Sequence, residues 1–255
     1  MISKKLKNIF CKKEIEEITT LKKELSRLKK ENKKLHIMNN FKDEVISAIS
    51  HEFKNPISII NGYIETILDS NLNEEMKIKF LNKIHKNTSR LSELIDRLYL
   101  ITKLENKKLK PNFSRFNLKQ VAKNIAESLS DRVIISGEDV EIYADKNLIE
   151  IVLNNLISNA LKYSKDKVTV NISGNKVCVI DKGKGIDPKD IELIKEKFYR
   201  VAKNDWDNSL GLGLAIVEHI LKLHNTFLEI ESEKGKGSKF CFSITSLKDK
   251  AHLQQ

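Results

Sequence analysis

The chain has 255 residues, of which 40% are apolar and 32% are charged, and its formal net charge is +11. This length is enough for about two domains with ordinary cores. No stretch approaches the ~18 apolar residues of a membrane span, and the start lacks the apolar segment of a secretory signal. We therefore expect a cytoplasmic protein.

The positive charge is concentrated at the N-terminus. Residues 1–40 hold eleven Lys and one Arg against five Glu, a net charge of +7, which leaves +4 for the other 215 residues. Aromatic residues do not alternate with these lysines, and no nucleic-acid-binding signature is present, so a solvated helix face is favoured and no nucleic-acid partner is expected. A weak contact of residues 1–13 with a membrane surface is the alternative, through Ile2, Leu6, Ile9 and Phe10.

The three cysteines, Cys11, Cys178 and Cys241, are far apart in the sequence. They share no metal-like spacing, so neither a disulfide framework nor a zinc site is predicted. Cys178 and Cys241 lie in apolar, strand-like stretches, where we expect plain core residues.

The first element is a helix with coiled-coil periodicity. Its apolar residues recur at steps of three and four, and Asn32 occupies the inward position that favours parallel pairing of two strands. We therefore expect residues 1–40 to form a basic coiled-coil helix, although a single amphipathic helix packed on its own domain remains open. The apolar positions are Ile18, Leu21, Leu25, Leu28 and Leu35.

Residues 41–68 continue the helix and carry His51. This histidine lies off the apolar stripe, in the sequence Ser50-His51-Glu52-Phe53-Lys54-Asn55-Pro56. An isolated His-Glu pair on a helix is usually a surface feature. Pro56 removes a helical hydrogen bond, however, and such broken local rules cluster at functional sites.

A second long helix is predicted over residues 76–105, after turn residues at 69–74. Two antiparallel helices cannot close a core alone, so we expect residues 41–106 to dimerise as a four-helix bundle. The basic stretch 107–116, which contains Pro111, is predicted to be a linker.

Residues 117–246 have a mixed pattern that predicts an α/β sandwich, so the whole chain is of the α+β class. Residues 199–210, which include Trp206, are too polar for a core and predict a mobile lid, while residues 247–255 form a tail. The expected helices cover residues 118–129, 146–161, 190–195 and 212–223, and the expected strands cover residues 133–136, 168–172, 177–180, 227–232 and 238–244.

Polar residues of the helix around position 155 suggest a phosphate or cation site. Asn155, Asn159 and Lys162 share one helical face. Amide oxygens suit a hard cation or its water, and a lysine suits phosphate. Asparagine is unfavourable inside a helix, so a helical role alone does not explain Asn155 and Asn159.

Two glycine-containing segments follow. Asp181 ends a strand and is followed by Gly183 and Gly185, so its carboxylate could accept from an exocyclic amine beside a flat base, although a tight turn explains the pattern equally well. Gly211 and Gly213 lead into a helix, which directs unpaired N–H groups at an anion. The later Gly-Lys-Gly-Ser segment, residues 235–238, is best explained as a hairpin turn.

These motifs, in this order, resemble those of the sensor histidine kinases of two-component systems. The motifs are His-Glu-x-x-Asn-Pro, Asn-x-x-x-Asn-Ala-x-Lys-Tyr, Asp-x-Gly-x-Gly, Phe-Tyr-Arg, Gly-Leu-Gly-Leu-Ala and Gly-x-Gly-Ser. The resemblance covers residues 41–246. It implies an ATP-binding domain of the Bergerat type, shared with gyrase and Hsp90.

The resemblance also implies roles for individual residues. His51 would be the phosphoacceptor, Glu52 the acid–base group that polarises its ring, and Asn55 the residue that positions water for dephosphorylation. Asn159 would be the Mg²⁺ ligand with Asn155 nearby. ATP would be bound by Lys162, Tyr163, Asp181, Gly183, Gly185, Gly211, Leu212 and Gly213, with Phe198 and Arg200 anchoring the lid.

The chain departs from the family pattern at three places. Ser209 stands where another glycine is usual, Phe53-Lys54 replaces Leu-Arg, and no sensing domain is recognisable on the N-terminal side. Ser209 affects the expected closure of the lid. The Phe53-Lys54 pair keeps the apolar and cationic character of the usual Leu-Arg pair.

The implied function is transfer of phosphate from ATP to His51 and then to an aspartate in the receiver domain of a response regulator, by a homodimer. One alternative is a protein that acts mainly as a phosphatase of that regulator. Another is a non-catalytic coiled-coil scaffold that senses nucleotide. An ATPase of the gyrase or Hsp90 kind would need a catalytic glutamate where Asn155 stands.

Overall fold

The computed structural model describes the backbone of residues 2–69, 72–106, 108–201 and 210–244, and the side chains of these residues except 2–19, 34–42, 44, 45 and 69. Most of the expected lid, with Trp206 and Ser209, therefore lies outside the described residues, as do the tail and the side chains proposed to touch a membrane. The chain divides into two compact units, residues 1–51 and 52–255. No helix among the described residues is long and apolar enough to cross a bilayer.

Helix α1 (Ile2–Asp69) accounts for the first unit and continues into the second. In the first unit, Leu21, Leu25 and Leu28 are 59%, 53% and 55% exposed. These are three of the positions that the heptad pattern predicts to face a partner. The chain by itself therefore leaves this apolar stripe uncovered.

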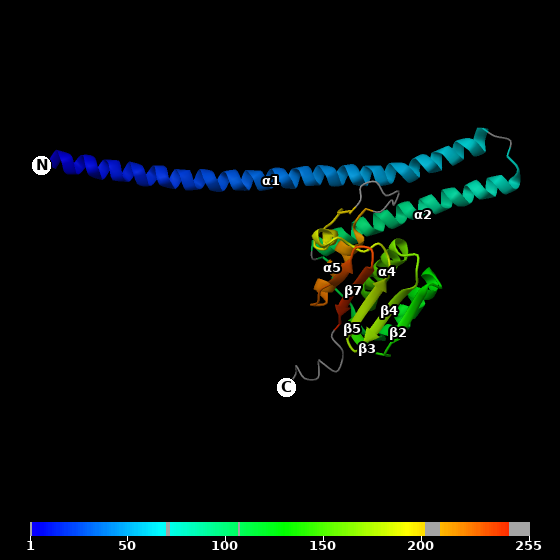
Figure 1. The fold of residues 1–255 in the computed structure, drawn as a ribbon. Helices are drawn as coiled ribbons and strands as arrows, with labels where there is room; N and C mark the ends of the chain where they lie inside the picture. The colour runs from blue at the N-terminus through cyan, green and yellow to red at the C-terminus, as the bar shows by residue number, and fades with distance from the viewer. Residues whose placement is uncertain (1, 70–71, 107, 202–209, 245–255) are drawn as a thin grey trace. The chain divides into compact units, whose positions relative to one another are not determined.

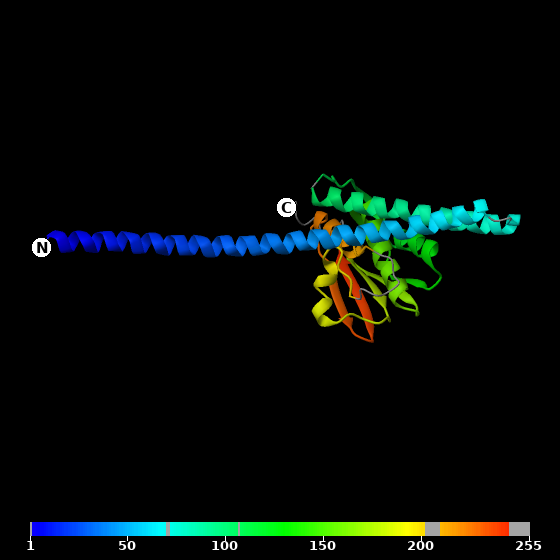
Figure 2. The ribbon, with the colours of Figure 1, turned by 90° about the horizontal axis from the view of Figure 1, so that it is seen from above.

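The second unit begins with a helical hairpin. The part of α1 after Glu52 runs antiparallel to α2 (Glu74–Glu105), and the rings of Tyr63 and Phe80 lie 5.1 Å apart between them (Figures 1 and 2). The side chain of Asn73 caps α2 by accepting from the Met76 N–H at 2.9 Å. Such a cap satisfies one of the free N–H groups of the first turn and so fixes where the helix begins.

The rest of the second unit is a five-stranded sheet with helices on one face (Figure 1). The strand order is β2-β4-β5-β7-β6, in which β2 and β4 are parallel and the other pairs antiparallel. Fully buried side chains such as Ile149, Val152 and Ile220 fill the space between helices and sheet. The elements are α3 (Leu118–Leu129), β2 (Val133–Gly137), α4 (Lys146–Tyr163), β4 (Val168–Ser173), β5 (Lys176–Asp181), α5 (Gly213–Leu223), β6 (Glu229–Glu233) and β7 (Gly237–Ser243).

The structure adds a second, two-stranded sheet that the sequence did not indicate. Strand β1 (Phe113–Asn117) pairs with β3 (Glu141–Asp145), so the end of the expected linker is a strand. The expected helix at 190–195 is instead two 3-10 turns, Pro188–Asp190 and Leu193–Lys195. Short strands depend on a distant partner, which hydrophobic periodicity alone does not reveal.

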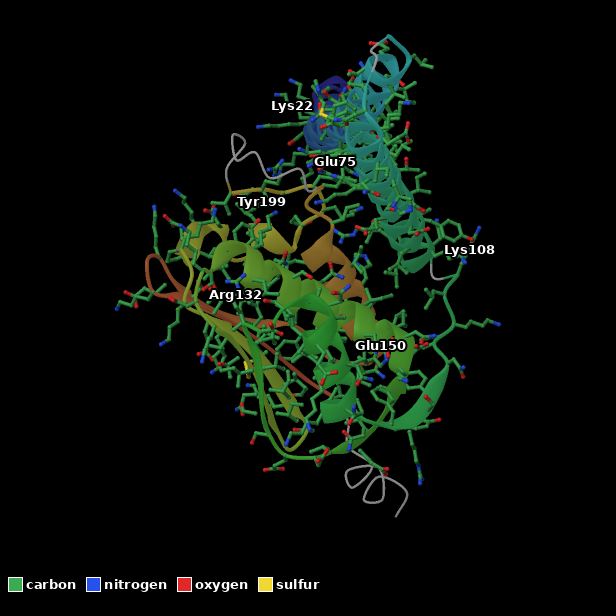
Figure 3. All side chains as sticks on the ribbon, turned by 90° about the vertical axis from the view of Figure 1, so that its right-hand side faces the viewer. Lys22, Glu75, Lys108, Arg132, Glu150 and Tyr199 are labelled. Carbon is green, nitrogen blue, oxygen red and sulfur yellow. A yellow bond between two sulfur atoms is a disulfide. The ribbon has the colours of Figure 1, made fainter. Side chains whose placement is uncertain are left out.

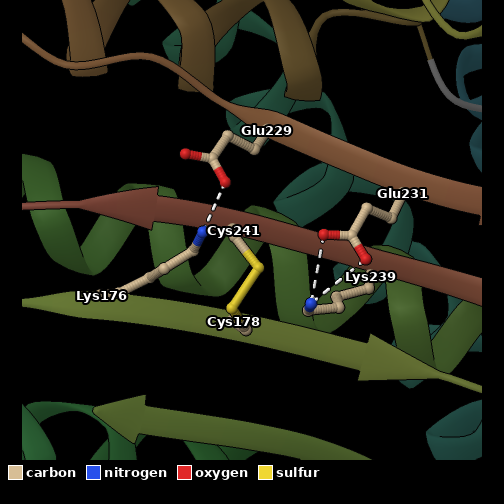
Figure 4. A network of polar contacts seen from close by, with 6 residues as sticks. All are labelled: Lys176, Cys178, Glu229, Glu231, Lys239 and Cys241. Atoms are coloured by element: carbon tan, nitrogen blue, oxygen red, sulfur yellow. Dashed lines mark hydrogen bonds and ion pairs between the residues drawn. A yellow bond between two sulfur atoms is a disulfide. The ribbon is translucent and has the colours of Figure 1, made fainter.

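The expectation of plain core cysteines is wrong for Cys178 and Cys241. Both are buried, at 7% and 1% exposure, but they form a disulfide across β5 and β7, where they are directly opposite each other (Figure 4). The two residues are 63 positions apart in the chain. Only the strand register brings them together, which explains why spacing in the sequence gave no sign of the bond.

Candidate functional site

A cavity of about 290 Å³ lies between α4, the ends of β5 and β7, and the start of α5. Its size is at the lower end of ligand pockets in proteins. Much of its lining is polar, and it gathers most of the residues that the sequence predicts for nucleotide binding: Asn155, Asn159, Lys162, Tyr163, Asp181, Gly185, Arg200, Gly211, Leu212 and Gly213.

Two asparagine amides of α4 face the first turn of α5. The Nδ2 group of Asn155 donates to the Ile151 carbonyl oxygen at 2.8 Å, which fixes the orientation of its amide. A Cβ atom on Gly213 would lie 2.9 Å from Asn155 Oδ1 and 4.0 Å from Asn159 Nδ2. Glycine at 213 therefore leaves these amide groups open toward the cavity.

Asp181 supplies a buried carboxylate at the end of β5. It is 6% exposed, and its Oδ1 accepts from the Gly183 N–H at 2.7 Å. Burial raises the pKa of Asp181, while hydrogen bonds from the backbone of Gly183 and Ser238 oppose that rise. One carboxylate oxygen is thus fixed by the loop, and the group can accept from a donor in the cavity.

The glycines after Asp181 are required by close packing of the backbone. A Cβ on Gly183 would lie 2.3 Å from the Tyr163 carbonyl oxygen, and a Cβ on Gly185, which has φ +63°, would lie 2.0 Å from the Glu233 carbonyl oxygen. Gly183 is outside the cavity lining. Its role in the structure is to let the loop approach the end of α4.

Helix α5 opens toward the cavity through a strained junction. Phe198 and Gly211 both have φ +64°, and the Phe198 N–H donates to the Gly211 carbonyl oxygen at 3.0 Å. Phe198 is therefore a neighbour of the glycine turn, and it is outside the lining. The first N–H groups of α5 have no partner within the helix, and together with the helix dipole they favour an anion.

Positive charge and an aromatic ring flank the same cavity. The Nζ atoms of Lys162 and Lys184 lie 5.0 and 4.7 Å from the centre of the Tyr163 ring. We did not predict Lys184 from the sequence, although its place between Gly183 and Gly185 was a signal. Such an arrangement suits a ligand that combines a flat base with phosphates.

Tyr199 and Ser238 also line the cavity; they belong to the Phe-Tyr-Arg and Gly-x-Gly-Ser motifs, but the sequence assigned no binding role to either. The Tyr199 hydroxyl donates to Asp190 Oδ1 at 2.8 Å, and this hydrogen bond to a carboxylate raises the pKa of Tyr199. Asp190 is itself buried at 6% exposure. The contact ties the first residue of the expected lid to the 3-10 turn at 188–190.

His51 lies on α1 and is exposed, as is Asn55 one helical turn later. Glu52 is buried at 8% exposure, and its carboxylate accepts from Arg90 Nη2 of α2 at 3.3 Å. The sequence did not predict this ion pair. It shows that the acid next to His51 is anchored to the second helix of the hairpin.

Two family models match the chain. The model described as "His Kinase A (phospho-acceptor) domain" matches residues 41–107. The model described as "Histidine kinase-, DNA gyrase B-, and HSP90-like ATPase" matches residues 144–248. The first contains His51, and the second contains α4, β5 and α5, which surround the cavity.

Several named proteins are similar to the chain. The phosphate regulon sensor protein PhoR of Pseudomonas aeruginosa is 30% identical over 225 residues, which are 81% of this chain and 51% of that protein. The sensor-like histidine kinase SenX3 of Mycobacterium tuberculosis is 28% identical over 228 residues, 82% of this chain and 55% of that protein. The chain therefore spans about half the length of the curated relatives it matches.

Among solved structures, the histidine kinase AdeS of Acinetobacter baumannii matches with a TM-score of 0.59 and 25% identity, over 77% of this chain and 98% of that chain. A full-length ShkA structure in complex with AMPPNP has a TM-score of 0.57 at 22% identity, over 80% of this chain and 46% of that chain, and shows likeness of fold. With both family models in the expected order, the chain belongs to the two-component sensor histidine kinases.

Proposed function

We propose that the chain is an ATP-dependent histidine kinase that phosphorylates His51 and passes the phosphate to an aspartate of a response regulator. The observation that carries this proposal is the cavity of the ATPase domain. It combines three features. The Asp181 carboxylate can accept a hydrogen bond from a nucleobase, and the open first turn of α5 and the flanking Lys162 can bind phosphates.

In this proposal the adenine lies at the Asp181 end of the cavity. The Asp181 carboxylate accepts from the exocyclic amine, and the Tyr163 ring covers the base. The phosphates lie toward the Gly211–Gly213 turn, where backbone N–H groups and Lys162 neutralise their charge. The burial of Asp181 strengthens its hydrogen bond, because water does not compete for the carboxylate.

A magnesium ion fits this site only together with the phosphates. Among the described residues, no group of three or more His, Cys, Asp or Glu side chains could hold a metal ion. Asn159 would supply an amide oxygen with Asn155 beside it, and phosphate oxygens would complete the coordination. When bound, the ion would neutralise charge on the transferred phosphoryl group.

At His51, phosphoryl transfer requires a neutral imidazole. One ring nitrogen bonds to the γ-phosphorus, the bond from phosphorus to the bridging oxygen of ADP breaks, and the proton on the other ring nitrogen passes to a base. Glu52 is the candidate for that base. Its ion pair with Arg90 anchors the carboxylate in the chain position next to His51.

We also propose that the chain works as a homodimer. The uncovered stripe of Leu21, Leu25 and Leu28 and the exposed apolar residues of the hairpin support pairing of two chains. The receiver domain of a response regulator would dock on the hairpin near His51. The lysine-rich residues 1–13 would add at most a weak contact with an anionic membrane surface.

The test is labelling with γ-³²P-ATP and Mg²⁺, comparing the wild type with His51→Gln and with His85→Gln, which changes another exposed histidine of the hairpin. We expect label in the wild type and in His85→Gln and none in His51→Gln. The label should move to a cognate receiver domain when that domain is added. Label that persists in His51→Gln would contradict the proposal.

A second activity, dephosphorylation of the regulator, is supported by the exposure of Asn55 four residues after His51. An amide at this place could position the attacking water. We expect Asn55→Ala to slow dephosphorylation of the regulator while leaving autophosphorylation near the wild-type rate. Equal loss of both reactions would instead indicate a structural role for Asn55.

The non-catalytic scaffold is separated from the kinase by the same labelling. A scaffold would bind nucleotide in the cavity and carry no label on any histidine. A protein that acts mainly as a phosphatase would label weakly and still dephosphorylate its regulator.

A further inference from the structure

We propose that Cys178 and Cys241 form a thiol–disulfide exchange site whose oxidation state controls nucleotide affinity of the ATPase domain. The exchange partners would be low-molecular-weight thiols and disulfides such as glutathione. The proposal depends on the geometry of the sheet and of the cavity, and it does not require that His51 be phosphorylated.

The cysteine pair lies on the sheet face opposite the helices. Side chains alternate along a strand, and the neighbours of Cys178, Val177 and Val179, are fully buried. The residues that share the face with the cysteines are polar, because Glu229 is directly opposite Cys241 and Asn171 directly opposite Cys178. The disulfide is therefore on the polar face of the sheet, and the side chains around it leave Cys178 and Cys241 only 7% and 1% exposed.

Two ion pairs flank the disulfide on this face (Figure 4). Lys176 Nζ lies 2.5 Å from a Glu229 carboxylate oxygen, and Lys239 Nζ lies 3.2 Å from the carboxylate of Glu231. The side chains of the first pair are 40% and 38% exposed. Ion pairs this exposed contribute little to stability, so they can open and admit a small thiol.

The disulfide is linked to the nucleotide cavity through the strand register. Cys178 lies three residues before Asp181 on β5, Cys241 lies three residues after Ser238 on β7, and Asp181 is directly opposite Ser238. Both Asp181 and Ser238 line the cavity. The backbone of Ser238 also donates a hydrogen bond to Asp181.

Reduction should therefore loosen the adenine end of the cavity. Two thiols need a wider separation of their sulfur atoms than a disulfide does, and without the bond β5 and β7 are no longer held together at this position. Asp181 and Ser238 are affected by that loss because they are on the same strand pair. The oxidised form keeps Asp181 in place and should bind nucleotide more tightly.

The exchange balances without any other reactant. One cysteine thiolate attacks oxidised glutathione, forms a mixed disulfide and releases one glutathione thiolate. The second cysteine then attacks the mixed disulfide, forms the Cys178–Cys241 bond and releases the second glutathione. Two electrons pass from the cysteine pair to the small disulfide, and the reverse reaction restores both thiols.

The test equilibrates the full chain with defined ratios of reduced to oxidised glutathione, counts free thiols by alkylation and mass spectrometry, and measures affinity for a fluorescent ATP analogue. We expect the bond to form and open reversibly, and the oxidised protein to bind the analogue at least about fivefold more tightly, a coupling of the usual size. Equal affinities of the two forms, or a bond that resists reduction in the native protein, would overturn the proposal.

Variants isolate the pair from Cys11. Cys11→Ser keeps both cysteines and should reproduce the redox dependence of the wild type. Cys178→Ser and Cys241→Val should each bind nucleotide with the affinity of the reduced protein at every glutathione ratio. If one variant fails to fold, the other carries the test, and redox-dependent affinity in either variant would contradict the assignment.

Discussion

Asp181 is under two opposing demands. Its burial disfavours the charged form and raises the pKa of Asp181, whereas the proposed bond to an adenine amine needs an acceptor at this place. Groups with such perturbed ionisation are common at functional sites. At this residue, binding and stability therefore favour different side chains.

We predict that Asp181→Asn lowers affinity for ATP by about tenfold or more, because an amide replaces one of two acceptor oxygens next to the amine. The same variant should be slightly more stable than the wild type at neutral pH, because a buried charge is removed while Oδ1 can still accept from Gly183. Titration with a fluorescent ATP analogue and urea unfolding measure the two effects. Unchanged affinity would remove Asp181 from the site.

The stability difference should depend on pH. A raised pKa of Asp181 means that the folded state holds the proton more tightly than the unfolded state, so the stabilisation from this group is full at low pH and is lost as pH rises through the folded pKa. Urea unfolding at several pH values measures the difference in free energy of unfolding between Asp181→Asn and the wild type. This difference should become smaller as the pH falls. A constant difference would indicate that the carboxyl group is not the cause.

At the residue scale, the sequence was informative where one short segment contains the whole motif. Asn155, Asn159 and Lys162 share a helical face by spacing alone, and the structure brings them to one cavity. Gly183 was expected beside the nucleotide, and the structure shows it packed against the Tyr163 carbonyl oxygen. The Cys178–Cys241 bond and the Glu52–Arg90 pair join distant segments, which spacing could not reveal.

At the element scale, one arginine holds the end of α4. The Arg132 guanidinium donates to the carbonyl oxygens of Leu161 at 3.1 Å, Ser164 at 2.9 Å and Asp166 at 3.4 Å. Figure 3 shows Arg132 on the domain that contains α4. Carbonyl groups at a helix end lack partners within the helix, and a cation there also complements the helix dipole. The last turns of α4 carry Asn159, Lys162 and Tyr163, so Arg132 positions part of the cavity wall.

We predict that Arg132→Ala lowers the free energy of unfolding by about 1–3 kcal/mol, because carbonyl groups in two partly buried hydrogen bonds lose a charged donor. Nucleotide affinity should also fall, and Arg132→Lys should restore part of both losses. Urea unfolding and nucleotide titration are the measurements, with the exposed Arg115→Ala as a matched control. Equal stability of Arg132→Ala and the wild type would contradict this role.

The elements that the sequence predicted best are those with a strong local signal. Helix α4 begins after the Asp145 cap and has apolar residues at helical spacing, and it lies close to its expected range. Strands β1 and β3 have five residues each and depend on each other, so their existence is a property of the folded domain. The 3-10 turns at 188–195 replace the expected helix where Pro188 follows Asp187.

At the scale of the whole molecule, exposed apolar side chains on the hairpin require a partner. Ile78, Leu81 and Ile95 of α2 are 57%, 55% and 55% exposed, and Ile57 and Ile64 of α1 are 44% and 40% exposed. A monomer that exposed so many large apolar residues on one hairpin would be prone to association. These residues fit the interior of the proposed four-helix bundle.

We predict that the wild type is a dimer in solution and that Leu81→Glu weakens the dimer by more than about tenfold, because a carboxylate would be buried at the interface. The exposed Lys79→Glu on the same helix introduces the same carboxylate at a position that is already polar and should remain dimeric. Sedimentation equilibrium at several protein concentrations measures both. A monomeric wild type, or an unchanged dimer in Leu81→Glu, would rule out this surface.

The central claim is that ATP bound in the cavity phosphorylates His51. The most direct measurement is mass spectrometry after incubation with Mg-ATP and tryptic digestion at alkaline pH. We predict a gain of about 80 Da, one phosphoryl group, on the peptide of residues 43–54, stable in alkali and lost in mild acid. Phosphate on Ser47 or Ser50 of that peptide, or on a different peptide, would contradict the account.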